Sequence, residues 1–174
     1  MPPAPDPLRS ASPGRDGRRG VDDAGLTAPL AGRALEVRRA RPEELDACAD
    51  LYVKVLRETF TWQAPDRHKH EDFFRAAREE EIYVAVAEGV ILGLAALYRP
   101  QSFLHSLYVD VRGLGVGAAL LDHVARQADG PLSLKVQEPN ARAQAFYARE
   151  GFICIERGRD PGSDVAWLRL VRET

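Results

Sequence analysis

The sequence predicts an α/β (α+β) fold, in which a mixed, mostly antiparallel central sheet of about seven strands is flanked by four helices. Three kinds of observation predict it. Short segments are apolar or alternate between apolar and polar residues, longer segments carry an apolar residue every three or four positions, and turn signals separate them. Their order, β-α-α-β-β-β-α-β-α-β-β, favours one sheet with helices packed against it.

The first 33 residues differ from the rest of the chain. They hold six of the twelve prolines and five of the fourteen glycines, and they contain no aromatic residue. A segment of this composition cannot bury enough apolar surface to offset the entropy lost on ordering. We therefore expect a disordered arm over residues 1–33 and one domain over residues 34–174.

The domain is expected to begin with a strand and a helix. Leu35 and Val37 alternate with charged residues, as in a half-buried strand. A helix then opens at Pro42, because proline suits the first turn and the carboxylates after it favour the positive end of the helix dipole. Apolar side chains recur along this helix and form one stripe, made of Leu45, Cys48, Tyr52, Val55 and Thr59.

A second, shorter helix and a hairpin follow. The helix is expected from about residue 66 to residue 80, with Phe73, Ala76 and Ala77 facing inward. Residues 82–87 and 90–98 have the pattern of two strands, and Glu88-Gly89 between them is a hairpin signal.

The second half of the domain alternates strands and helices. The expected elements are a strand at 103–109, a helix at about 116–128, a strand at 132–136, a helix at 141–150, and strands at 152–155 and 165–171. Gly151 stands where a helix commonly ends in the left-handed conformation.

Composition excludes several classes of function. The 24 Lys and Arg residues against 26 Asp and Glu leave a net charge of −2, which does not favour a nucleic-acid partner. The longest apolar run, Val90–Leu97, is far shorter than the roughly 20 residues of a membrane span. Cys48 and Cys154 form neither a disulfide framework nor a metal-ligand spacing. The N-terminus lacks the apolar core of a signal peptide, so we expect a cytoplasmic protein that binds neither nucleic acid nor membrane.

A glycine-rich turn between the strand at 103–109 and the next helix is the most informative local signal. Gly113, Gly115 and Gly117 allow the backbone to curl with its N–H groups pointing inward. The helix start adds unpaired N–H groups and a partial positive charge. This pattern predicts a cradle for phosphate or pyrophosphate, with Arg112 at its mouth. The alternative is a tight turn without a ligand.

The turn alone leaves the class of nucleotide open. A P-loop requires Lys-Ser/Thr after the last glycine, and Ala118-Ala119 stand there instead. A dinucleotide site accepts Gly113-x-Gly115-x-x-Ala118 and an acidic residue about 20 positions on, near Glu138.

A second motif follows the strand at 132–136, where Asn140 is suited to cap the next helix. Together the two motifs resemble the signatures of the GNAT (GCN5-related) N-acetyltransferase superfamily. The matching residues are Arg112-x-x-Gly115-x-Gly117 and Asn140-x-x-Ala143-x-x-Phe146-Tyr147-x-x-x-Gly151-Phe152. The resemblance extends over about Leu35 to Val171. One departure is visible, because only Val111 separates Asp110 from Arg112, where the family usually has about three residues.

The resemblance implies an acyltransferase that uses acetyl-CoA as cosubstrate and no metal. It implies direct transfer, in a ternary complex, to a primary amine of a small molecule or peptide, by a monomer or homodimer with a splayed pair of central strands. The residues that match the family's cofactor-binding segments are Leu107, Tyr108, Val109, Arg112, Gly113, Leu114, Gly115, Val116, Gly117, Ala118, Asn140 and Phe146.

Two residues are the catalytic candidates. Tyr147 matches the family's usual general acid, which protonates the departing thiolate; the alternative is a core aromatic residue with a satisfied hydroxyl. His105, two residues before Leu107 on the predicted strand, is the candidate general base, because an imidazole titrates near neutral pH. Other candidates for the base are Glu138, Glu58 and Glu71. His68-x-His70 lacks a third ligand nearby, so we expect no metal site.

In this family the acceptor pocket lies largely at the first two helices and their connection. That region holds aromatic residues and carboxylates that suit a small cationic amine: Tyr52, Phe60, Trp62, Phe73, Glu58, Asp66 and Glu71. A CoA-binding regulatory module without catalysis is the alternative function, and a nicotinamide-dependent oxidoreductase is a third.

Overall fold

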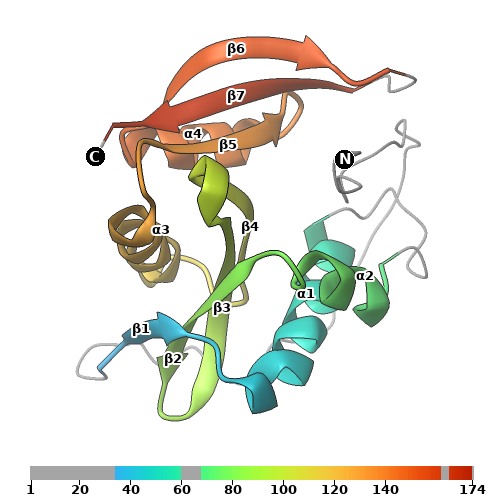
Figure 1. The fold of residues 1–174 in the computed structure, drawn as a ribbon, viewed down its shortest axis with the longest axis vertical. Helices are drawn as coiled ribbons and strands as arrows, with labels where there is room; N and C mark the ends of the chain where they lie inside the picture. Colours follow the sequence, from blue (N-terminus) through green and yellow to red (C-terminus); the bar gives the residue numbers. More distant parts are fainter. Residues whose placement is uncertain (1–33, 60–67, 162–164, 174) are drawn as a thin grey trace.

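In the computed structural model, residues 34–59, 68–161 and 165–173 are described, and the expected arm over residues 1–33 lies outside them. Seven strands in the described part form one sheet with the order β1-β2-β3-β4-β5-β7-β6 (Figure 1). Their bounds are β1 Glu36–Arg39, β2 Glu81–Ala87, β3 Val90–Tyr98, β4 Phe103–Val109, β5 Leu132–Gln137, β6 Ile153–Arg159 and β7 Ala166–Arg172. All neighbours pair antiparallel except β4 and β5, which are parallel. The predicted fold class is confirmed.

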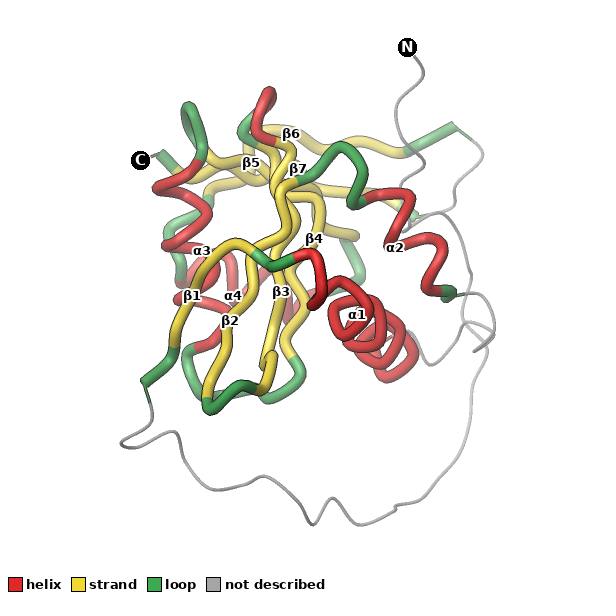
Figure 2. The backbone as a smooth tube through the Cα atoms, turned by 60° about the horizontal axis from the view of Figure 1, so that its bottom comes forward, coloured by secondary structure: helices red, strands yellow, loops and turns green. Residues whose placement is uncertain are grey.

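Helices cover both faces of the sheet, as Figures 1 and 2 show. Helices α1 and α2 lie on one face, and α3 and α4 lie on the other. The bounds are α1 Leu45–Thr59, α2 His70–Ala76, α3 Val116–Gln127 and α4 Ala141–Arg149, with 3-10 turns η1 at Pro42–Glu44 and η3 at Arg99–Gln101. Within the described ranges, no helix is long and apolar enough to span a membrane.

The sheet separates two apolar cores because successive side chains of a strand point to opposite faces. On β2, Tyr83 and Ala85 pack toward α3, whereas Ile82 and Val84 pack toward α1. Both faces of this strand are covered by helices, which is why it is apolar almost throughout. At β4, the strand that leads into the glycine-rich turn, the two cores lie on opposite faces of the sheet.

The hairpin prediction is confirmed in detail. Glu88 and Gly89 have φ angles of 50° and 77°, and both lie in the left-handed region that a two-residue turn of this type requires. Helix α4 is likewise followed by Gly151 at φ 84°.

Helix α2 is shorter than predicted, because it covers residues 70–76 and not 66–80. Its end is followed by Glu79, Glu80 and Glu81. Carboxylates are unfavourable at the negative end of a helix dipole, so the chain leaves the helix there and enters β2 at Glu81. Residues 66 and 67, where the helix was expected to begin, lie outside the described residues. Strand β6, in contrast, continues to Arg159, beyond the expected end at residue 155.

Candidate active site

The central strands β4 and β5 diverge along most of their length. They pair at only two positions, of which the last joins Leu104 to Leu134. Beyond that point β4 stays paired with β3 as far as Val109, and β5 stays paired with β7 as far as Gln137. Residues 105–109 therefore have no partner on β5. Backbone N–H and C=O groups without a partner on the neighbouring strand suit an extended ligand that carries amides.

The glycine-rich turn lies at the end of β4, and two of its glycines adopt left-handed conformations. Gly113 and Gly115 have φ angles of 80° and 75°. A Cβ atom added at either glycine would meet no atom within 4 Å, so the space beside the turn is open. The first helical hydrogen bond of α3 runs from the Ala119 N–H to the Gly115 carbonyl at 3.0 Å. The N–H groups of the preceding turn remain for an anion, and Arg112 is exposed beside them.

Gly117, one of the predicted cofactor-binding residues, lies where two helices pack closely. A Cβ at this position would lie 3.1 Å from Cζ of Phe146 and 3.7 Å from a side-chain carbon of Val109. The bare Gly117 backbone thus lets α3 and α4 approach each other. The side chains of Leu107, Val109 and Phe146 pack against the core on this face of the sheet.

Helix α4 fixes the catalytic candidate Tyr147. The Asn140 side-chain oxygen accepts a hydrogen bond from the Ala143 N–H at 3.1 Å, which confirms the predicted N-cap. The Tyr147 ring makes edge contacts with Phe146 and Phe152, at centroid distances of 5.2 and 5.4 Å. Burial, with a smaller contribution from Tyr108, raises the pKa of the Tyr147 hydroxyl above its ordinary value. The phenol is therefore protonated at neutral pH and can donate a proton.

A pocket lies on the opposite face of the sheet, between β4 and the two N-terminal helices. It is lined by Tyr52, Phe73, Ala76, Ala77, Glu80, Leu94, Ala96, Ser106 and Tyr108. The Tyr52 ring meets Tyr108 edge-on at 5.5 Å and Phe73 at 5.8 Å. Tyr108 packs against the core on the pocket face, whereas Tyr147 packs against the core on the other face. Tyr108 belongs to the segment of β4 that has no partner on β5.

His105 lies at the start of that gap. The register between β3 and β4 shifts here, so that Leu97 pairs with Leu104 and Ala96 with Ser106. The unpaired His105 stacks on Tyr98 at 6.0 Å, and its Nδ1 is hydrogen-bonded to the carboxylate of Glu80. Only 5% of the Glu80 side chain is exposed, against 35% for His105. A buried carboxylate on one ring nitrogen fixes the tautomer and orientation of an imidazole.

Sequence reasoning missed Glu80, because it stands among charged residues at a helix end and no local pattern distinguishes it. The other candidates for the base lie elsewhere. Glu138 pairs with Arg157 at 3.4 Å. Glu58, Glu71 and His105 itself do not line the pocket, but Glu80, the partner of His105, does.

The remaining candidates of the acceptor region and the histidine pair can also be placed. Phe60, Trp62 and Asp66 lie outside the described residues. His70 pairs with Asp50 at 2.8 Å. Across the described ranges, no group of three His, Cys, Asp or Glu side chains is arranged to hold a metal ion.

Comparisons with known proteins confirm the family resemblance and the fold predicted from the sequence. Residues 45–152 match the family described as "Acetyltransferase (GNAT) family". A curated relative is the peptidyl-lysine N-acetyltransferase YjaB of Escherichia coli (strain K12), which is 30% identical over 145 residues, 78% of this chain and 95% of that protein.

Solved structures show the same fold. The apo form of YjaB from Escherichia coli has a TM-score of 0.64 at 26% identity and covers 79% of this chain and 97% of its own. The PaiA N-acetyltransferase of Thermoplasma acidophilum, solved in complex with coenzyme A, has a TM-score of 0.63 at 16% identity over 81% of this chain and 99% of its own. The second similarity concerns the fold alone.

Proposed function

Because this chain belongs to the GNAT family of acetyltransferases, we propose that it transfers the acetyl group of acetyl-CoA to a primary amine of a small molecule or peptide, directly within a ternary complex. The observation that carries the proposal is the gap between β4 and β5, which begins at His105 and opens toward the glycine-rich turn. The gap lies between the Tyr147 side of the sheet and the pocket lined by Tyr52 and Tyr108. The Tyr147 side of the sheet suits the cosubstrate, and the side with the pocket suits the acceptor.

The residues present fit acetyl-CoA. The N–H groups at the start of α3, with Arg112, suit the pyrophosphate. The unpaired backbone of residues 105–109 suits the pantetheine arm, whose amides need hydrogen-bond partners. Acetyl-CoA would supply the thioester carbonyl, and a backbone N–H of this segment would stabilise negative charge on its oxygen.

His105 and Tyr147 divide the proton transfers. His105 accepts the proton that the acceptor amine must lose, and Glu80 holds its ring with the second nitrogen free for that task. Tyr147 donates its hydroxyl proton to the sulfur as the carbon–sulfur bond breaks. The products are an N-acetylated amine and CoA, and the Tyr147 proton is replaced from solvent or from the imidazolium.

The test has two stages, both on the full chain. Calorimetric titration with acetyl-CoA is expected to show binding at sub-millimolar concentration. Release of free CoA is then measured with a panel of polyamines, amino acids, aminoglycosides and lysine-containing peptides. The lysine peptides are included because the relative YjaB is named a peptidyl-lysine N-acetyltransferase. Absence of acetyl-CoA binding would overturn the proposal, whereas binding without transfer to any amine would favour a non-catalytic CoA-binding module.

A further inference from the structure

Strands β5 and β7 carry cationic and aromatic side chains on the face of the sheet that also bears the pocket. Leu134, Leu168 and Leu170 of these strands point into the core beneath α3 and α4. Because side chains alternate, Lys135, Trp167 and Arg169 point to the other face. Lys135 and Arg169 stand directly opposite each other in the antiparallel register.

Trp167 is itself held in place and positions Lys135. Its indole N–H donates to the Asp160 carboxylate at 3.1 Å. Its ring lies against Gly158 of β6, where a Cβ atom would come within 2.3 Å of the ring. The Lys135 ammonium sits 3.9 Å from the ring centroid, a cation–π contact that keeps the charge on this face.

Arg169 is incompletely satisfied. Its Nε is buried and has no hydrogen-bond partner among the described residues. The residue opposite it on β6 is Glu156, which is exposed. A buried guanidinium N–H without an acceptor is unfavourable, and an anionic ligand is the acceptor that a guanidinium binds most strongly.

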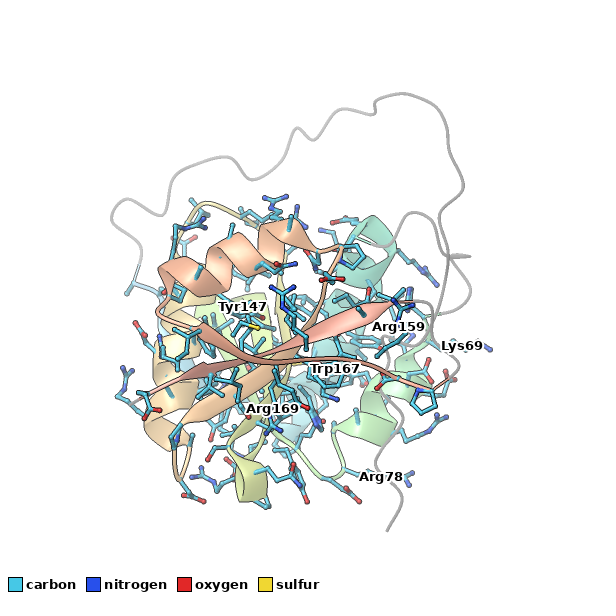
Figure 3. The ribbon with its side chains drawn as sticks, turned by 90° about the horizontal axis from the view of Figure 1, so that it is seen from above. Lys69, Arg78, Tyr147, Arg159, Trp167 and Arg169 are labelled. Carbon is cyan, nitrogen blue, oxygen red and sulfur yellow. The ribbon has the colours of Figure 1, made fainter. Side chains whose placement is uncertain are left out.

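Figure 3 shows Arg169, Trp167 and Arg159 on the β6–β7 side, with Lys69 and Arg78 on the side of α2.

Lys135 and Arg169 lie close enough to His105, the proposed base, for one small molecule to contact both ends. His105 adjoins Leu104, the last β4 residue paired with β5, and Arg169 is one strand beyond β5. Neighbouring strands lie about 4.8 Å apart where they pair, so two strand spacings place the Arg169 backbone roughly 10 Å from Leu104, and the divergence of β4 from β5 beyond Leu104 adds to this distance. The side chains of His105 and Arg169 occupy part of this distance, so a small molecule can span the remainder. This face of the sheet is therefore negative near the Glu80 carboxylate and positive near Lys135 and Arg169.

We propose that the acceptor is a small amine that also carries a carboxylate or phosphate group, and that Arg169 and Lys135 bind this anion while the amine nitrogen faces His105. The inference rests on the proposed function. It adds an anionic group to the small cationic amine that the aromatic and acidic residues near α1 and α2 suggested from the sequence.

The first experiment compares matched acceptors with the full chain and saturating acetyl-CoA. β-Alanine is paired with β-alaninamide, and ethanolamine phosphate with ethanolamine, and CoA release gives kcat/KM for each. In at least one pair, the member with the carboxylate or phosphate is expected to exceed the member without it by about tenfold or more, the strength of one charge-assisted hydrogen bond. Arg169→Gln should remove that ratio, and Arg149→Gln, which deletes the same charge on the exposed surface of α4, should not. Equal rates within both pairs would overturn the inference.

The second experiment does not depend on turnover. The Nε–Hε NMR signal of Arg169, identified by its loss in Arg169→Lys, is followed while CoA-saturated protein is titrated with acetate or with inorganic phosphate. A saturable shift is expected for one of the two anions, which separates carboxylate from phosphate recognition, and Lys135→Gln should weaken its apparent affinity. A shift that never saturates for either anion would overturn the inference even in an active enzyme. Failure of acetyl-CoA to bind would instead overturn the proposed function.

Discussion

The imidazole Nδ1 of His105 is hydrogen-bonded to the carboxylate of Glu80, which comes from the junction of α2 and β2, 25 residues earlier in the chain. This contact joins an exposed ring to a carboxylate that is almost fully buried. It gives the proposed base a fixed orientation, in the way that a carboxylate orients histidine in other acyl-transfer sites.

If the two residues act as a unit, their substitutions should not be additive. We expect His105→Gln to lower kcat by about 10²-fold, a usual effect of losing a general base. Glu80→Gln should lower it by a smaller factor, and the double variant should lose little more than His105→Gln alone. Acetyl-CoA affinity should be unchanged in all three. Glu79→Gln, an exposed neighbour, is the control, and fully additive losses would contradict the coupling.

Tyr147→Phe should leave the packing intact, because the ring still contacts Phe146 and Phe152. Loss of the hydroxyl should lower kcat by roughly 10²-fold, with little change in cosubstrate affinity. Burial raises the pKa of this phenol above its ordinary value of 10.0, so the acid form persists and Tyr147 should cause no loss of wild-type activity below pH 10. Tyr83→Phe is the control for removal of a tyrosine hydroxyl. A variant with parental kcat would exclude Tyr147 as the acid.

Gly115→Ala should weaken acetyl-CoA binding, because a non-glycine residue at φ 75° costs about 1–2 kcal/mol and the turn would relax away from this conformation. Gly89→Ala introduces the same strain at φ 77° in the β2–β3 hairpin and should not affect binding. Calorimetry with acetyl-CoA measures both. Equal affinities of the two variants would argue against the turn as the pyrophosphate site.

Gly117→Ala should lower the melting temperature, because the added methyl group would lie 3.1 Å from the Phe146 ring. Combination with Phe146→Leu, which shortens the opposing side chain, should recover part of that loss. Thermal unfolding of the two single variants and the double variant measures the coupling. Independent effects would show that the two positions do not pack against each other.

Glu81 should make stability depend on acid pH. Hydrogen bonds from Arg99 hold the pKa of Glu81 at about 2, against an ordinary value of 4.5. Because the pKa is lower in the folded state, the carboxylate stabilises the fold above pH 4.5, and this contribution is lost as the pH falls toward 2. The melting temperature of Glu81→Gln should therefore lie below that of the wild type at pH 7, and the two should converge at low pH. A constant difference would contradict the assignment.

Features that depend on neighbouring residues were predictable from the sequence. The hairpin at Glu88-Gly89, the Asn140 cap and the left-handed Gly115 follow from the conformations those residues favour. The order of strands and helices follows from the apolar periodicity in the same way. Two ends differed substantially: α2 ended before its apolar pattern did, where a run of carboxylates follows, and β6 continued to Arg159.

The composition of the site was decided by the tertiary structure. Glu80 reaches His105, Gly117 lies under Phe146, and Lys135 stands beside Arg169 only because particular registers bring these residues together. Local patterns do not encode register across a sheet, and a slip of one residue would move every side chain of a strand to the opposite face. The chain's motifs therefore indicate where acetyl-CoA would bind, whereas the pairing of distant strands determines which charges face the acceptor.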